Sequence, residues 1–90
     1  MSPSIEAVTA VVAAFLRRTN GKLNGIAADT PLLRGGLLDS FGVLSLSAEV
    51  SDVLQLNLPT GSLMMEDFES PRVLWERITQ LRSSESRPRP

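Results

Sequence analysis

Two polar residues, Asp39 and Ser40, stand where a glycine-containing loop meets a helix-forming run in the stretch GGLLDSFGVLSL, residues 35–46. The Ser40 hydroxyl can cap the helix, which is worth about 1 kcal/mol. If Asp39 is the cap instead, Ser40 becomes the first helical residue and its hydroxyl is free for a covalent attachment. In both arrangements the first-turn amides and the helix dipole favour a phosphate at this point.

Most catalytic roles for this serine are excluded by composition, because the chain has no cysteine and no histidine. That removes the Ser-His-Asp triad, the Cys-His pair and the usual zinc ligands. A hydrolase that uses Ser40 with a carboxylate or a lysine remains a weak alternative, since no triad and no oxyanion hole can be recognised. We therefore expect a protein that is not an enzyme.

Size and charge restrict the partners. Ninety residues suffice for one small domain with a modest core. Nine basic residues against ten acidic ones give a net charge of −1, without the basic excess of a nucleic-acid-binding protein. The apolar run AVTAVVAAFL is too short to span a bilayer and continues into Arg17 and Arg18 rather than a cleavage site. We expect a cytoplasmic monomer that does not insert into membranes.

The first element that must position the serine is an amphipathic helix. Ser2 and Pro3 are typical of a cap and first turn, apolar residues then recur at spacings of three and four, and the helix should end near Arg18, before Asn20 and Gly21. Residues 19–39 hold several glycines interleaved with leucines, which predicts a long loop anchored by apolar side chains. Loops of this kind are often functional.

The rest of the chain is also helical in pattern. A second helix is predicted over about 41–55, with Leu44, Ser47, Val50 and Leu54 on one apolar stripe and Val43, Leu46 and Val53 beside it. SLMMEDF suits a short third helix, and Ser70 with Pro71 suits the start of a last helix through Leu81. We expect an all-α, four-helix bundle of three longer helices and one short third helix, with residues 1–82 as the domain and 83–90 as a disordered tail.

This arrangement resembles the acyl carrier proteins over about residues 5–82. DTPLLRGGLLDSFGVLSL resembles the loop and second helix of that family, and SPRVLWERITQL resembles its last helix. GLLDSFGVLSL is especially similar to freestanding acyl, aminoacyl and D-alanyl carriers, and it lacks the GGHS form usual in peptidyl carriers.

The resemblance implies a covalent cofactor. A phosphopantetheinyl transferase would use coenzyme A and Mg²⁺ to attach 4′-phosphopantetheine to Ser40, and Asp39 would take part in transferase recognition. The thiol of the arm would carry an acyl or aminoacyl group as a thioester. An acyl- or aminoacyl-activating ligase and a downstream synthase or transferase would be the other partners. The cargo does not follow from the carrier sequence.

The resemblance also implies a partner surface on the second helix, made of Phe41, Val43, Ala48, Glu49 and Asp52. Phe41 equally suits packing back onto the loop leucines. The residues Met64, Met65 and Phe68 either border a groove for cargo or fill the core, and the acidic residues Glu66, Asp67 and Glu69 form either a second docking patch or a solvated face. The alternative function is a cofactor-free helical adaptor that binds proteins through an apolar groove.

Overall fold

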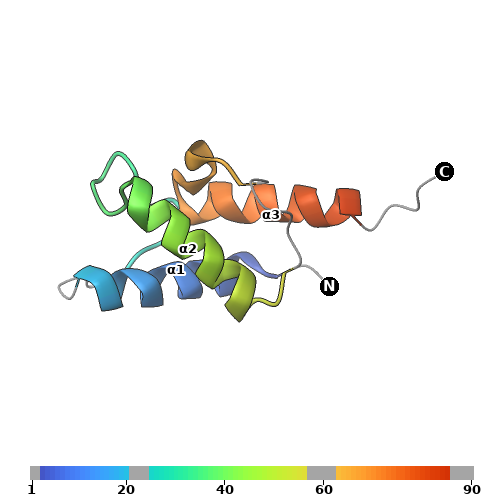
Figure 1. The fold of residues 1–90 in the computed structure, drawn as a ribbon, viewed down its shortest axis with the longest axis horizontal. Coiled ribbons are helices and arrows are strands. Elements are labelled where there is room, and N and C mark those ends of the chain that lie inside the picture. The colour runs from blue at the N-terminus through green and yellow to red at the C-terminus, as the bar shows by residue number, and fades with distance from the viewer. Residues whose placement is uncertain (1–2, 21–24, 57–62, 86–90) are drawn as a thin grey trace.

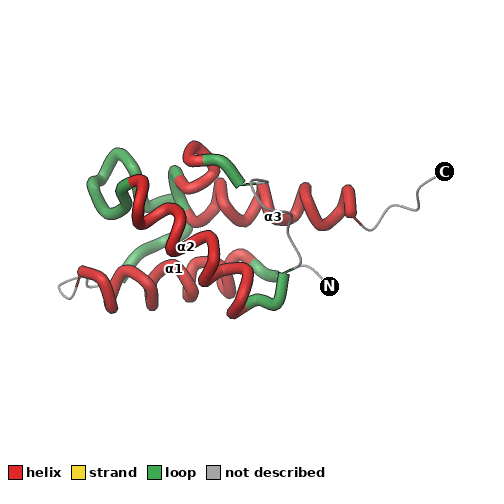
Figure 2. The backbone as a smooth tube through the Cα atoms, viewed as in Figure 1, coloured by secondary structure: helices red, strands yellow, loops and turns green. Residues whose placement is uncertain are grey.

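A computed structural model of the chain describes residues 3–20, 25–56 and 63–85 (Figure 1). The regular elements in these ranges are the α-helices α1 (Ile5–Asn20), α2 (Ser40–Val53) and α3 (Pro71–Glu85), and the 3₁₀ helix η1 (Met65–Phe68). Figure 2 shows no strand in the same ranges. The all-α prediction is confirmed for them, and the predicted short third helix appears as one 3₁₀ turn.

The three α-helices share one core. α1 packs against both α2 and α3, and η1 contacts α2 and α3. In Figure 1, α1 and α3 run in opposite directions and α2 crosses them obliquely. The buried apolar residues of the helices are Val8, Val11, Val12, Phe15, Leu16, Val43, Leu46, Val50, Phe68, Leu74 and Ile78.

The start of α1 differs from the prediction. Ser4 is the residue before the helix, and its side-chain oxygen accepts a hydrogen bond from the amide of Ala7 at 3.1 Å. Pro3 precedes the helix instead of lying in its first turn. The predicted cap, Ser2, lies outside the described residues. The helix also continues two residues past the predicted end, to Asn20.

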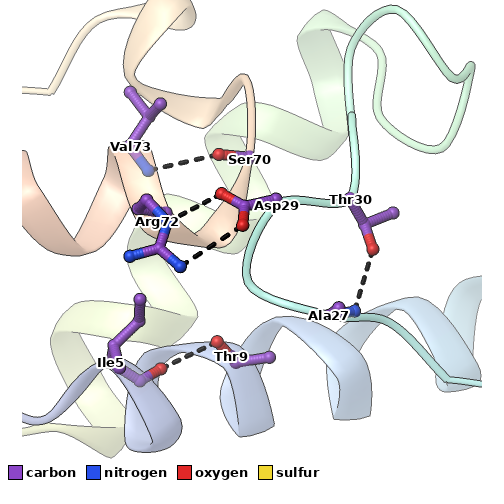
Figure 3. A network of polar contacts seen from close by, with 8 residues as sticks. All are labelled: Ile5, Thr9, Ala27, Asp29, Thr30, Ser70, Arg72 and Val73. Atoms are coloured by element: carbon purple, nitrogen blue, oxygen red, sulfur yellow. Dashed lines mark hydrogen bonds and ion pairs between the residues drawn. The ribbon is translucent and has the colours of Figure 1, made fainter.

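The start of α3 agrees with the sequence. Pro71 is the first helical residue, and the Ser70 hydroxyl accepts a hydrogen bond from the amide of Val73 at 3.2 Å, as Figure 3 shows. Pro71 lacks the amide hydrogen that would go unused at this position. The helix runs to Glu85, three residues into the segment predicted as a tail, and residues 86–90 lie outside the described part.

α2 ends in a Schellman turn. The amide of Gln55 donates to the Asp52 carbonyl at 3.3 Å, and that of Leu56 donates to the Ser51 carbonyl at 2.9 Å. Gln55 therefore adopts a φ of 52°, although it is not a glycine. The sequence continues with two helix-breaking residues, Pro59 and Gly61, which lie outside the described residues.

The loop before α2 is attached to the start of α3. The guanidinium of Arg72 faces the carboxylate of Asp29 (Figure 3), with N–O distances of 2.7 and 3.3 Å. The Arg72 amide donates to the Ala28 carbonyl at 2.8 Å, and the Leu32 amide donates to the Glu69 carbonyl at 2.7 Å. These contacts attach the loop to the start of α3.

None of the described helices is long and apolar enough to cross a membrane.

Candidate functional site

Asp39, not Ser40, caps α2. Its backbone is extended, with φ −115° and ψ −174°, and its Oδ1 atom accepts a hydrogen bond from the amide of Gly42 at 2.7 Å. The first helical hydrogen bond runs from the Val43 amide to the Asp39 carbonyl at 2.9 Å. Ser40 is therefore the first residue of the helix.

The Ser40 side chain is exposed, and within the described ranges its hydroxyl forms no hydrogen bond. The backbone amides of Ser40 and Phe41 also have no acceptor there, because they belong to the first turn, where no preceding carbonyl is in reach. An accessible hydroxyl thus stands beside two unused amide donors at the positive end of a helix.

A tight turn in the loop brings the chain to Ser40 at the start of α2. A Cβ on Gly35 would stand 2.4 Å from the Pro31 carbonyl oxygen, and Gly36 has a φ of +76°. After the turn, the amides of Leu37 and Leu38 both donate to the Leu32 carbonyl, at 2.9 and 3.0 Å. Leu32 and Leu38, two of the leucines expected to anchor the loop, are buried. Because Leu38 is held in the core, the next two residues, Asp39 and Ser40, have a fixed place on the surface.

Two neighbouring side chains leave little space for a side chain at Gly42. A Cβ at this position would stand 3.2 Å from Cδ2 of Leu38 and 3.3 Å from Oδ1 of Asp39. Both distances are shorter than ordinary van der Waals contact. The glycine therefore lets the cap and the buried leucine approach the helix start.

The exposed face of α2 differs from the expected partner surface. Phe41 and Leu44 leave 76% and 72% of their area in solvent, and Ala48 and Asp52 are exposed on the same face. Val43 is buried and therefore does not belong to this exposed face. The neighbouring Leu44, which the sequence pattern puts on the apolar stripe, is exposed instead. The two exchange places because Val43, Leu46 and Val50 form the face that meets the core.

The remaining predicted surface residue, Glu49, is mostly covered. Its carboxylate pairs with the guanidinium of Arg18 on α1, leaving 22% of its side chain exposed. Arg18 also lies over the Phe15 ring, 6.0 Å from its centroid. Glu49 therefore joins α2 to α1, while Phe41, Ala48 and Asp52 remain accessible.

A pocket of about 520 Å³ opens beside Ser40. The end of α1, the loop and the start of α2 form its walls, with side chains that include Phe15, Thr19, Leu37, Phe41 and Ser45. Phe41 is thus exposed at the rim of this pocket and is not folded into the core.

The η1 region is divided between core and surface. Phe68 is fully buried, whereas Met64 and Met65 are 53% and 46% exposed. Among the acidic residues, Glu69 pairs with Arg34, and Asp67 lies 3.7 Å from Arg77 and accepts the Met64 amide at 2.8 Å. Two of the three predicted patch carboxylates therefore have cationic partners.

No described base contacts the Ser40 hydroxyl, and the described residues contain no cluster of three acidic side chains suited to a metal ion. Neither the protein-family models nor the curated proteins match this chain.

Proposed function

We propose that this protein is an acyl carrier that presents acyl or aminoacyl groups, as thioesters, on a 4′-phosphopantetheine arm attached to Ser40. The observation that carries the proposal is the exposed Ser40 hydroxyl, free of hydrogen bonds in the described structure, at the first position of α2. Capping by Asp39 leaves that hydroxyl available to a modifying enzyme.

The residues around Ser40 fit a phosphodiester. The free amides of Ser40 and Phe41 point along the axis of a helix whose positive end lies here, and both favour an anion. When attached, the arm supplies the thiol that the chain lacks. Ser40 holds the phosphate, and Asp39 preserves the helix start through its bond to Gly42.

The exposed face of α2 suits transient docking of partner enzymes. Phe41 and Leu44 lie one turn apart and offer apolar anchors next to the attachment point. Asp39 and Asp52 are exposed at the two ends of the helix, so basic partner surfaces would be attracted. Tethering the cargo gives each docked enzyme a high effective concentration without tight binding.

In this proposal η1 is the counterpart of the short third helix of the carrier family, and the protein acts as a cytoplasmic monomer. Its partners are a phosphopantetheinyl transferase, an acyl- or aminoacyl-activating ligase and a downstream synthase or transferase. Helix-surface chemistry selects these partners, and the partners select the cargo.

The exposed pair Phe41 and Leu44 also favours a second candidate, a cofactor-free adaptor that binds proteins through this apolar face. In an adaptor the serine would have no chemical role. The substitution Ser40→Ala would then leave partner affinity unchanged.

Intact-mass measurement tests the carrier proposal. The chain is incubated with a promiscuous phosphopantetheinyl transferase, coenzyme A and Mg²⁺, and we expect a gain of one phosphopantetheine. Ser40→Ala should gain nothing, while Ser51→Ala, a control in the same helix, should be modified like the parent. A folded parent that stays unmodified would overturn the proposal and favour the adaptor.

A further inference from the structure

The pocket beside Ser40 lies on the side of α2 that faces α1, and it borders the exposed face proposed for docking at Phe41, which lies at its rim. Resting on the proposed carrier function, we infer that this pocket is the seat of the pantetheine arm between encounters with partner enzymes. The chain would then shelter the arm between α1 and α2, on a different side from η1.

The position of the pocket next to Ser40 supports this inference. Asp39 and Phe41, the residues before and after Ser40, both line the pocket. Consecutive Cα atoms are only about 3.8 Å apart, so a group attached to Ser40 begins at the pocket rim. The volume of about 520 Å³ falls within the range of small-molecule sites.

The lining matches the chemistry of the arm, which carries two methyl groups and two amides. Phe15 and Leu37 supply apolar surface. Ser45 offers a hydroxyl that forms no hydrogen bond with any described residue. The Thr19 hydroxyl donates to the Phe15 carbonyl at 3.1 Å and keeps its lone pairs free to accept from an amide.

An ion pair holds the two walls together. Glu49 lies one turn beyond Ser45 on α2, and its partner Arg18 lies between Phe15 and Thr19 in the sequence of α1. The pair therefore connects the helices next to the pocket, so the walls are in place before the arm arrives.

Amide NMR spectra test whether the arm occupies the pocket. The ¹⁵N-labelled protein is loaded as above, its mass is confirmed, and spectra are compared before and after loading. We expect shifts at Thr19, Gly36 and Ser45, and nuclear Overhauser contacts from the methyl groups of the arm to the Phe15 ring. Both Thr19→Phe and Ser45→Phe, which fill the pocket from opposite walls, should abolish these contacts. Ala10→Phe, on an exposed part of α1, should keep them.

The outcomes separate the seat from the carrier function. Successful loading with shifts confined to residues 39–42 overturns the seat and leaves the carrier function intact. Contacts from the arm to Met64, Met65 or Phe68 would also overturn it, because they put the arm on the η1 side of α2. Absence of any mass gain overturns the carrier function and the seat with it. Two pocket-filling variants are used so that a folding defect in one, detected by circular dichroism, does not remove the test.

Discussion

Asp39 and Gly42 are fitted to one another: the carboxylate accepts the Gly42 amide at 2.7 Å, and a Cβ on residue 42 would stand 3.3 Å from the same oxygen. The cap and the glycine therefore form one unit. It gives Ser40 a helical position without using its hydroxyl.

Substitution of Asp39 separates its capping role from recognition by the transferase. Asp39→Ala should lower the free energy of unfolding by about 1 kcal/mol, whereas Asp39→Asn should keep most of the stability because asparagine caps equally well. Urea denaturation measures both. If the transferase recognises the charge, Asp39→Asn will be folded yet slowly loaded. Equal destabilisation by the two variants would contradict the capping role.

The glycine turn before the site should be sensitive at both positions, for different reasons. Gly35→Ala forces a Cβ to 2.4 Å from a backbone oxygen, so we expect a loss of about 1–3 kcal/mol, as in overpacking. Gly36→Ala meets no atom but must adopt a φ of +76°, which costs about 1 kcal/mol. Thermal denaturation of both variants measures which of them loses more stability. A Gly35→Ala variant as stable as the parent would show that the Pro31 carbonyl moves away freely.

The same substitution at Leu44 and Leu46 should change stability by very different amounts. Leu46→Ala removes a fully buried side chain and should cost about 2–5 kcal/mol. Leu44→Ala removes a side chain that is 72% exposed and should leave stability within about 0.5 kcal/mol. Chemical denaturation tests this contrast. A large loss for Leu44→Ala would mean that the exposed face of α2 is covered in solution.

The pair Asp29 and Arg72 predicts an acid-dependent contribution to stability. Hydrogen bonds from Arg72, reinforced by its charge, hold the pKa of Asp29 below its usual value. A carboxyl with a lower pKa in the folded chain stabilises the fold above its unfolded pKa, about 3.9, and this contribution is lost as the pH falls through the folded value.

We therefore expect the parent to lose stability more steeply than Asp29→Asn as the pH falls below about 4. Urea midpoints across the acid range measure this, and added salt should reduce the difference because both side chains are exposed. Parallel curves for the two proteins would contradict the prediction.

The end of α2 offers a stabilising substitution. Gln55 has a φ of 52°, a backbone conformation that is unfavourable for residues that carry a Cβ. Gln55→Gly should therefore raise the free energy of unfolding by about 1 kcal/mol. Gln80→Gly, the same exchange at an exposed site inside α3, should lower it by about 1 kcal/mol. Denaturation curves that show the same sign for both would argue against the left-handed turn.

Local signals in the sequence were sufficient where neighbouring residues decide the structure. Ser70 and Pro71 mark the start of α3 because capping needs only residues within one turn. The cap of α2 stayed open between Asp39 and Ser40 because both residue types cap well. The rotation of α2 was misassigned because apolar residues occur around most of the helix, and only its packing into the shared core decides that Val43 faces inwards and Leu44 outwards.

Long-range contacts of the site were not foreseeable from the pattern. The ion pairs of Arg18 with Glu49 and of Arg72 with Asp29 join residues 31 and 43 positions apart. Their formation depends on how the helices are arranged, and charge spacing within one helix does not indicate it. The pocket beside Ser40 was missed for the same reason, since Phe15 and Thr19 come from α1.

The attachment of the loop to α3 has a consequence for the order of events during synthesis. Leu32 and Arg72 secure the loop through bonds that require residues 69 and 72 to be present. A ribosome-bound chain that ends soon after Ser40 therefore contains the serine but cannot hold the loop that presents it. If the proposed carrier function holds, Ser40 becomes a substrate only after the start of α3 has left the ribosome, and we expect its modification to follow synthesis of the chain at least as far as Arg72.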